Sequence, residues 1–490
     1  MTQTVLQKLI RSRPIERMVD ANERTGSGGL GRTLGLFSLT MIGVGATIGT
    51  GIFFTMVEAV PKAGPAVIVS FLIAATTAGL TALCYAELAA RIPASGSSYS
   101  FAYATVGEFA AFIMAACLLL EYGLGASATA IGWSAYLNNF LANAVHWQIP
   151  HFLRAPMLVA GEHGVELHPG QFNLPPVMLV CLCGVMLARG TKESASMNAA
   201  MVVIKLAILA FFVVVAATGF EAKNFVPFFN TDNSKGLAGM VGVTTAAGTV
   251  FFSFIGLDTV ACGGEEVRNP RRNVPIGIMA ALVIVTVFYL FVAVAALGAQ
   301  PAAQFAGQEA GLSVILQTVT GSAWPAITLS AGAVISVFSV TLAMIYGQTR
   351  ILFAISRDGL IPKVFRKVNA RTMTPVGNTI IVCMAVGLVA GLVDSEFLWD
   401  MVSMGTLTAF SVVSIAVPVL RYKQRAAPQS GFRLPFGPYL VPSLSIAACL
   451  YIMKSLSLMT LHVFTIWISC AILIYLFYGL RNSGLNRIAT

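Results

Sequence analysis

Long apolar runs, separated by short polar segments, repeat along almost the whole chain. An α-helix rises about 1.5 Å per residue, so roughly 20 apolar residues cross a hydrocarbon layer of about 30 Å. The pattern therefore predicts an all-α integral membrane protein with about twelve transmembrane helices. The predicted spans lie near residues 34–57, 65–90, 104–143, 173–189, 194–219, 237–266, 275–298, 324–355, 376–393, 397–420, 437–455 and 459–480. Because the third run is longer than a bilayer requires, we expect it to tilt steeply or to project into the loops.

Composition supports a membrane location. The chain has 490 residues, of which 57% are hydrophobic and 10% charged, and its mean hydropathy is +0.81. Soluble globular domains carry about 25% charged residues. The polar first thirty residues lack the short apolar region of a cleavable signal peptide. We expect a multi-pass protein of the inner (plasma) membrane that begins with a cytoplasmic tail.

The distribution of Lys and Arg predicts the orientation. With the N-terminus inside, nearly all of the 30 Lys and Arg residues fall in cytoplasmic segments, as the positive-inside rule requires. The exceptions are Lys62, Arg154, Lys223, Lys235 and Lys454, which lie outside, and Lys205, which lies within a span. Both termini are therefore expected in the cytoplasm. The net charge of +10 is explained by this topology and by contact with anionic lipids, and it does not indicate a nucleic-acid partner.

The cysteines and histidines do not predict a metal site. All eight cysteines lie in apolar segments, so no disulfide framework is expected. Cys181 and Cys183 form a C-x-C pair without a neighbouring histidine. Four of the five histidines lie in the long outer segment 144–173, at spacings that match no standard metal motif. We expect no metal and no cofactor.

Glycines interrupt the first span in the stretch "MIGVGATIGTGIFF", from Met41 to Phe54. A glycine-rich nucleotide loop is one interpretation, but no strand–turn–helix unit surrounds the stretch. Close packing of helices through small residues is a second. The third is a broken helix, whose free N–H groups would bind a carboxylate and whose free C=O groups would bind an ammonium. Thr50 would add a hydroxyl beside the glycines.

The sixth span contains a similar interruption, in "TVFFSFIGLDTVACGGEEVRNP" from Thr249 to Pro270. Spans one and six are five apart, as two inverted five-helix repeats require. We therefore predict a cytoplasmic tail (1–33), a first five-helix repeat (34–219) and a second, inverted repeat (237–420). Two additional helices (437–480) and a second cytoplasmic tail (481–490) follow. Two broken helices could together hold the carboxylate and the ammonium of an α-amino acid.

Three ionisable residues, Glu121, Lys205 and Asp258, lie well inside spans. An insertion scale puts such a residue at about +2.5 to +3.5 kcal/mol at the helix centre, so a functional role is the first hypothesis. A structural ion pair is the alternative. Lys205 is the candidate for proton coupling, because a buried lysine can change its protonation with its surroundings. Glu87, Glu265 and Glu266 lie near the cytoplasmic ends, where ion pairs with arginine are expected.

Several motifs together resemble the amino acid–polyamine–organocation superfamily, and most closely the bacterial cationic amino acid transporters. They are "GVGATIGTGIF", "LLLEYGLGASATAIGWSAY", "VFFSFIGLDTV", "EEVRNPRRNVPIGI" and "MIYGQTRILFAISRDGLIPKVF". The resemblance covers about residues 30–480. It implies the leucine-transporter fold, with broken helices 1 and 6, and amino acid uptake coupled to protons rather than sodium.

The resemblance also implies roles for individual residues. It places the substrate carboxylate near Thr50 and Gly51 and an aromatic gate at Phe252. It places Lys205 near the position that sodium occupies in related proteins. The substrate ammonium would meet carbonyls near Ala46 or Thr47 and near Phe252, Ser253 and Ile255, and the side-chain pocket would include Glu121, Asp258 and Met344. Thr47 departs from the bulky aliphatic residue that related proteins often carry, and it alters the pocket wall.

The sequence thus predicts a secondary transporter, not an enzyme, that imports amino acids by alternating access. Cationic substrates such as arginine, lysine and ornithine are expected, and neutral amino acids are included. An exchanger of broader or neutral specificity is the alternative, and a channel or a non-transporting sensor is a more distant one. The expected partners are the substrate, protons and membrane lipids, and a small membrane subunit is left open.

Overall fold

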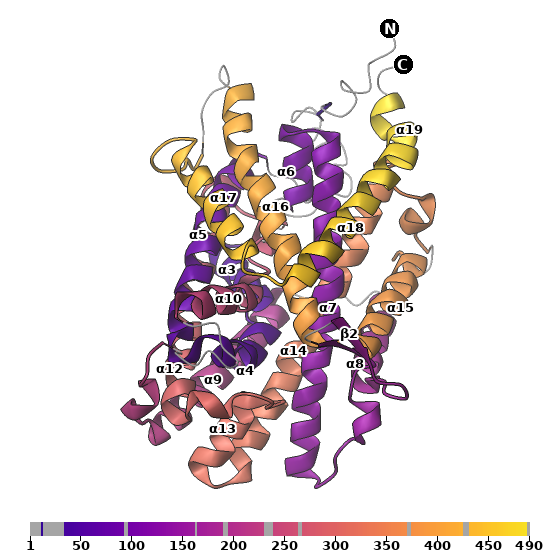
Figure 1. Ribbon diagram of the computed structural model, residues 1–490. Helices are drawn as coiled ribbons and strands as arrows, with labels where there is room; N and C mark the ends of the chain where they lie inside the picture. Colours follow the sequence, from indigo (N-terminus) through magenta and orange to yellow (C-terminus); the bar gives the residue numbers. More distant parts are fainter. Residues whose placement is uncertain are drawn as a thin grey trace.

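The structure is a computed structural model, and it is a bundle of helices (Figure 1). It describes residues 11–12, 34–92, 97–161, 164–189, 195–229, 239–262, 267–369, 374–424 and 431–487. Within this part of the chain, eight helical segments are long and apolar enough to cross a membrane, and five shorter apolar helices accompany them. The predicted class, an all-helical membrane protein, is confirmed at this level.

The helices of the first half are α3 (Leu36–Thr47), α4 (Thr50–Ala63), α5 (Val67–Arg91), α6 (Ser97–Thr105), α7 (Glu108–Ala144), α8 (Leu174–Ala188) and α9 (Ala195–Ala216). Those of the second half are α10 (Met240–Phe251), α11 (Thr259–Cys262), α12 (Pro270–Ala299), α13 (Gly311–Thr320), α14 (Ala323–Arg357), α15 (Val376–Leu392), α16 (Ser395–Lys423), α17 (Leu440–Met453), α18 (Leu458–Ile474) and α19 (Leu480–Asn482). Single turns include η5 (Phe252–Phe254), η7 (Lys363–Arg366) and a π-helical turn at Tyr475–Gly479.

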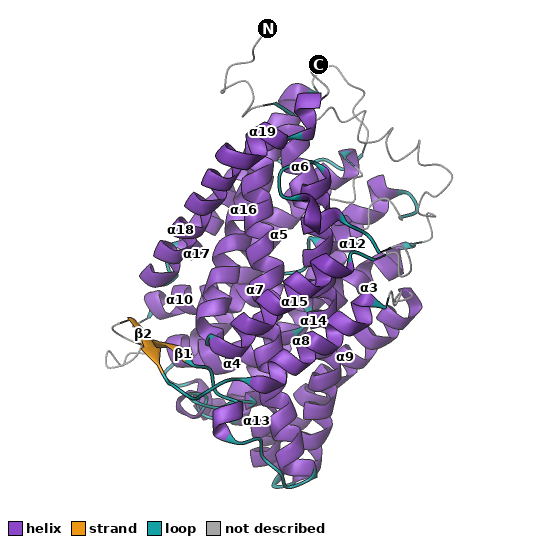
Figure 2. Ribbon diagram, turned by 90° about the vertical axis from the view of Figure 1, so that its right-hand side faces the viewer, coloured by secondary structure: helices purple, strands orange, loops and turns teal. Residues whose placement is uncertain are grey.

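Helix occupies each of the twelve ranges that the sequence predicts, with some differences at the boundaries. The predicted third span begins too early. Residues 104–105 still belong to α6, and Gly107, with a φ of 131°, separates that short helix from α7. The features that were not predicted include the first part of α6, the helix α13 and the antiparallel hairpin of β1 (Leu158–Gly161) and β2 (Gly164–Leu167). Figure 2 shows the hairpin toward the opposite end of the molecule from α19.

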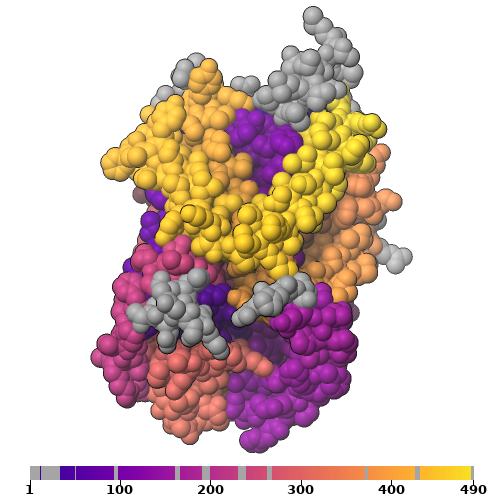
Figure 3. Space-filling view, viewed as in Figure 1, coloured from indigo at the N-terminus to yellow at the C-terminus, as the bar shows by residue number. Residues whose placement is uncertain are grey.

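Two groups of helices make up most of the bundle. In one group α5 packs against α12 and α10, and α12 also packs against α3. In the other α7, α8, α14 and α15 pack against one another, while α16 contacts both α7 and α5. The C-terminal helices α17 and α18 lie on the outside of the face shown in Figure 3. The groups therefore meet along a central boundary, and α3, α4, α10 and α11 lie near it.

The helix of the glycine-rich stretch is broken, as the sequence predicts. α3 ends at Thr47 and α4 begins at Thr50, with Ile48 and Gly49 between them in non-helical conformations. Gly51 then approaches the other interrupted helix so closely that a Cβ built there would lie 2.4 Å from the Cα of Ser253. The packing interpretation is therefore also correct, because small residues at this point allow two backbones to touch.

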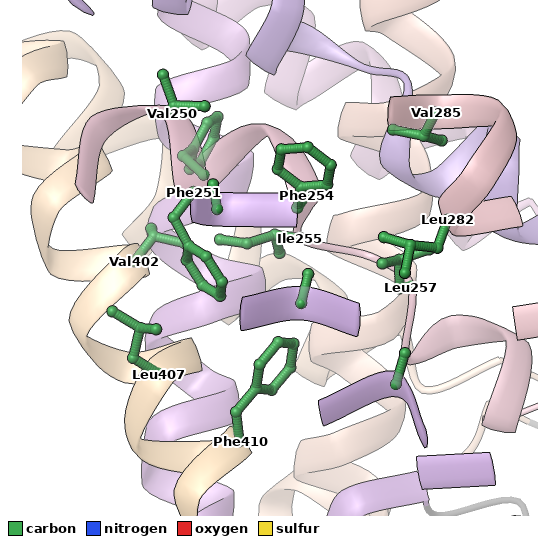
Figure 4. Packing of buried hydrophobic residues seen from close by; sticks show 14 of the residues in the cluster. Val250, Phe251, Phe254, Ile255, Leu257, Leu282, Val285, Val402, Leu407 and Phe410 are labelled. Atoms are coloured by element: carbon green, nitrogen blue, oxygen red, sulfur yellow. The ribbon is translucent and has the colours of Figure 1, made fainter. Parts of the chain in front are cut away.

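The second interruption separates α10 and η5 from α11. Residues 255–258 form turns there, and Gly256 has a φ of 104°. α3 packs against α11, while α4 packs against α10 and η5, so the two broken helices run side by side in opposite directions. Figure 4 shows the second break among apolar side chains of α12 and α16, with Phe254, Ile255 and Leu282 labelled. The breaks are thus buried in protein, as unwound backbone at bilayer depth must be.

A buried acid fixes one end of the bundle. Glu87 of α5, which is fully buried, accepts two hydrogen bonds from the Arg421 guanidinium at 2.7 and 2.6 Å and forms a second ion pair with Arg91. The expectation of ion pairing is confirmed for Glu87. Glu265 and Glu266 lie outside the described residues.

Gly256 provides a direct test of how closely the two breaks approach. A Cβ built on Gly256 would lie 2.7 Å from the carbonyl oxygen of Ala46, and the positive φ already disfavours an L side chain. Gly256→Ala should therefore lower the free energy of unfolding by about 2 kcal/mol or more. Gly377→Ala is the matched control, because it lies in α15 with no other atom within 4 Å and should change stability by no more than about 1 kcal/mol. Equal melting temperatures for the two purified variants would contradict this arrangement.

Candidate functional site

The carbonyl end of α3 is held by groups from other elements. The last four C=O groups of a helix have no partner within it. Here the Gly45 carbonyl accepts a hydrogen bond from the Lys205 ammonium at 3.1 Å, and the Thr47 carbonyl accepts one from the Tyr289 hydroxyl at 2.9 Å. Lys205, on α9, is 3% exposed. A cation at this position is also favoured by the helix dipole, which is negative at the C-terminal end.

The N–H end of α4 faces the same interruption. Gly49 precedes this helix, and no described side chain caps the first N–H groups of the helix, which lie at a helix end that favours an anion. Thr55, one turn further on, donates to the Gly51 carbonyl at 2.7 Å, and its oxygen lies 3.0 Å from the hydroxyl of Ser253. The first break therefore presents donors on one side and acceptors on the other. The side chain of Thr50 lies outside the described residues.

Tyr289 of α12 contacts both interruptions. Its hydroxyl lies 2.9 Å from the carbonyl oxygen of Thr47 and 2.8 Å from that of Ser253. Its ring is fully buried and packs edge-on against Phe71 and Phe254. One phenolic O–H is thus shared between two backbone acceptors, and it links two segments that are more than 200 residues apart in sequence.

Two carboxyl groups lie beside the second break. Glu121 of α7 and Asp258 are 3% and 4% exposed, and they lie within electrostatic range of each other. Tyr122 donates a hydrogen bond to Asp258 at 3.4 Å, and the Thr406 hydroxyl of α16 neighbours Glu121. The helices α7 and α16 and the second break therefore bring polar groups to one buried place, where a cationic group could be neutralised.

Apolar side chains also lie near the two breaks. The sulfur of Met344, on α14, lies against Gly125 of α7, at 3.2 Å from a Cβ built there. Ile255 is buried at the second break, and the hydroxyl of Thr47 donates a hydrogen bond to the carbonyl of Gly43 at 2.8 Å.

An aromatic cluster lies on the α13 side of the breaks. Phe252 has its ring centroid 6.1 Å from that of Trp399, which also lies 6.5 Å from Phe54. Phe54 in turn packs edge-on against Tyr136, at 5.0 Å. We call Phe54, Trp399 and Phe252 the aromatic floor, because a cavity lies beyond it.

This cavity has a volume of about 560 Å³. It is lined by side chains of α4, α7 and α16 and by the segments before α8 and α13, and its charged members are Glu58, Lys62, Arg154, Glu309, Asp394 and Glu396. Lys62 forms an ion pair with Glu396 at 2.7 Å, and Arg154 pairs with Glu309. Burial raises the pKa of the Asp394 carboxyl above its ordinary value.

The structure brings together most of the residues that the sequence singled out. Ala46, Thr47 and Gly51 lie at the first break, and Ser253, Ile255 and Asp258 lie at the second. The prediction of their binding roles stays a prediction. Within the described part of the chain, no group of three His, Cys, Asp or Glu side chains is arranged to hold a metal.

Sequence reasoning missed Tyr289, Trp399 and Tyr122. Tyr289 could have been found, because a tyrosine in the middle of an apolar span needs a partner for its hydroxyl. Trp399 gave no such signal, since tryptophan near the end of a span is ordinary in membrane proteins. Tyr122 is adjacent to Glu121 in sequence, but its contact with Asp258 depends on how α7 and the second break pack.

Comparison with known proteins gives a consistent result. Residues 34–481 match the family described as amino acid permease. The chain is 40% identical over 98% of its length to a methylthioribose transporter of Bacillus subtilis and 38% identical over 98% of its length to a branched-chain amino acid permease of that organism, covering 100% and 99% of those proteins. It is 34% identical to a vacuolar cationic amino acid transporter of Arabidopsis thaliana over 84% of this chain and 64% of that protein.

The shared hydroxyl of Tyr289 generates a prediction about stability. Tyr289→Phe keeps the ring but leaves two buried carbonyls without this donor, so the free energy of unfolding should fall by about 1–3 kcal/mol. Tyr451→Phe is the control, because its hydroxyl bonds to Thr244 from a half-exposed ring. A thermal unfolding curve of each purified variant in detergent is the measurement. A loss that is no larger for Tyr289→Phe would contradict the central role of its hydroxyl.

Proposed function

This chain belongs to the amino acid permease family, and from that premise we propose that it imports amino acids across the plasma membrane by alternating access. In this proposal both chain termini lie in the cytoplasm, as the Lys and Arg distribution predicts. The cavity beyond the aromatic floor then faces the outside. The proposal includes the leucine-transporter arrangement, which has two inverted repeats and two added helices.

One observation carries the proposal, the pair of facing helix breaks in the buried centre. α4 begins there with uncapped N–H groups, while carbonyls converge there from α3 and η5. A carboxylate and an ammonium on one carbon match such a pair of backbone ends. In the proposal the substrate carboxylate binds near Thr50 and Gly51, and the ammonium binds near Ala46 or Thr47 and near Phe252, Ser253 and Ile255.

The two buried carboxyl groups support a cationic substrate. Glu121 and Asp258 lie near each other at the second break, and the side chain of arginine, lysine or ornithine would supply a positive charge to pair with them. Met344 contributes an apolar wall, which suits the methylene part of such a side chain. Several similar proteins are named as cationic amino acid transporters, which agrees with this choice.

Coupling to protons rests on Lys205. Its ammonium donates to the Gly45 carbonyl at the end of α3, so a change in its charge would alter how that helix end is held. Because α3 and α4 meet at the substrate site, protonation of Lys205 would bias the first break between two conformations. In this proposal no sodium ion is needed at the end of α3.

A second candidate substrate has an observation in its favour. A methylthioribose transporter is 40% identical to this chain along its whole length, and a branched-chain amino acid permease is 38% identical. A neutral or broader specificity, or a thiosugar, is therefore the alternative. Both candidates share the fold and the breaks, and they differ in what the acidic side-chain pocket would bind.

Uptake into proteoliposomes tests the proposed function. Labelled L-arginine, L-leucine and methylthioribose are each offered with and without an inward proton gradient. Accumulation of arginine that exceeds equilibrium only with the gradient is the expected result. Accumulation of methylthioribose without either amino acid would refute amino acid import, and passive, non-saturable flux would indicate a channel.

Removing one carboxylate from the side-chain pocket should change selectivity. Glu121→Gln is expected to weaken arginine binding about tenfold or more, since charge-assisted hydrogen bonds contribute about 1.5–3 kcal/mol. Leucine binding should change by less than about twofold. Competition assays with both amino acids are the measurement, with Glu166→Gln on the exposed hairpin as the control. An equal loss for arginine and leucine would indicate a structural role for Glu121.

Removing the ammonium of Lys205 should uncouple uptake from protons. Lys205→Ala is expected to retain substrate binding, because the two breaks stay in place, but to lose most gradient-driven accumulation. The assay uses L-leucine at zero membrane potential, because a cationic substrate also responds to the potential, by about 2.3 kcal/mol per charge per 100 mV. Lys454→Ala is the control, since that side chain is exposed. An unchanged pH dependence of uptake in Lys205→Ala would assign the coupling to another group.

A further inference from the structure

We propose that the cavity beyond the aromatic floor is a second, outer binding site for a free α-amino acid, separate from the site at the helix breaks. The inference rests on the proposed function for the identity of the ligand. Its structural basis is independent of that site, because the residues lining the cavity include none from the interruptions at residues 48–51 and 252–258. Phe54 and Trp399 lie between the two places and belong to the lining of the outer one.

The cavity has a suitable size and is a defined space. Its volume of about 560 Å³ falls within the range of about 300–1,000 Å³ that is typical of small-molecule sites. Residues of α4, α7 and α16 line it, together with loop residues near Arg154 and Glu309. The Arg154–Glu309 pair joins the segment before α8 to the segment before α13, and this bridge covers part of the space.

An ammonium group has an acceptor in this cavity. The two cationic side chains of the lining are already paired, Lys62 with Glu396 and Arg154 with Glu309. Glu58 forms no hydrogen bond or ion pair within the part of the chain that the structure describes. Glu58 lies one helical turn from Phe54 on α4, so both face the cavity from the same side of the helix.

A carboxylate group has donors there. Trp399 is 3% exposed, and its indole N–H has no acceptor among the described residues. The Nε–H of Arg154 also lacks an acceptor there, although another nitrogen of the same guanidinium pairs with Glu309. Buried polar groups without partners are uncommon in native structures, and a bound ligand is one way to satisfy them.

These groups together match a zwitterion. The ammonium of an α-amino acid would bind the carboxylate of Glu58, and its carboxylate would accept from Trp399 and Arg154. Because Trp399 also packs against Phe252 and Phe54, an amino acid bound here rests directly on the aromatic floor. The outer site would therefore collect substrate next to the barrier that it must pass.

Equilibrium binding to the full-length protein in lipid nanodiscs tests this inference, with labelled L-arginine and L-leucine as probes. The parent protein is expected to bind two molecules of a transported amino acid per chain. Glu58→Gln should keep one site and weaken the other about tenfold or more, and Trp399→Phe, which keeps an aromatic ring but removes the N–H, should do the same. Glu166→Gln, a carboxylate outside the cavity lining, is the matched control and should keep both sites.

Uptake by the same variants separates the two proposals. Glu58→Gln should raise the apparent KM several-fold and leave the maximal rate within about twofold of the parent. A parent that transports amino acids but binds one molecule per chain, or a Glu58→Gln variant that matches Glu166→Gln in both assays, overturns the outer site alone. A parent that neither binds nor transports either amino acid overturns the proposed function and the outer site together.

Discussion

The centre of this protein is organised by one constraint, that backbone N–H and C=O groups cannot remain without partners in an apolar surrounding. Two helices are interrupted there, and each interruption releases several such groups. Lys205 and the Tyr289 hydroxyl donate hydrogen bonds to carbonyls at the end of α3, and Tyr289 also donates to the carbonyl of Ser253. The two breaks are stable because they lie against each other and share these partners.

The same constraint explains the glycines. At Gly51 and Gly256 each broken helix approaches the backbone of the other, so that a Cβ would lie 2.4 Å from Ser253 Cα or 2.7 Å from the Ala46 carbonyl oxygen. Glycine weakens a helix by about 1 kcal/mol relative to alanine. In a continuous spanning helix the glycines would only reduce stability. Here they allow the close contact through which the backbone groups of both breaks reach one buried place.

The apolar runs and the glycines of the chain predicted twelve helical ranges and both interruptions, because each depends on residues that are close in sequence, whereas α13 was not predicted. The boundary between α6 and α7 was missed, since Val106 and Gly107 interrupt an otherwise apolar run by conformation rather than by polarity. The hairpin β1–β2 was also missed, because four-residue strands in a polar segment leave a weak pattern. Contacts between residues far apart in sequence could not be predicted from it. Nothing local to Trp399 indicates that it packs between Phe54 and Phe252.

This division between local and distant information bears on specificity. Backbone groups are the same in every amino acid sequence that folds this way, so in the proposed site those at the breaks would recognise only what all substrates share. In the proposed site, discrimination would come from side chains that approach from other elements, such as Glu121 on α7, Met344 on α14 and Thr406 on α16. These elements belong partly to the helix group that packs apart from α5 and α12. In the proposed transport cycle, a relative movement of the two groups would change the side-chain pocket and access to the breaks at the same time, and this would link the choice of substrate to its passage.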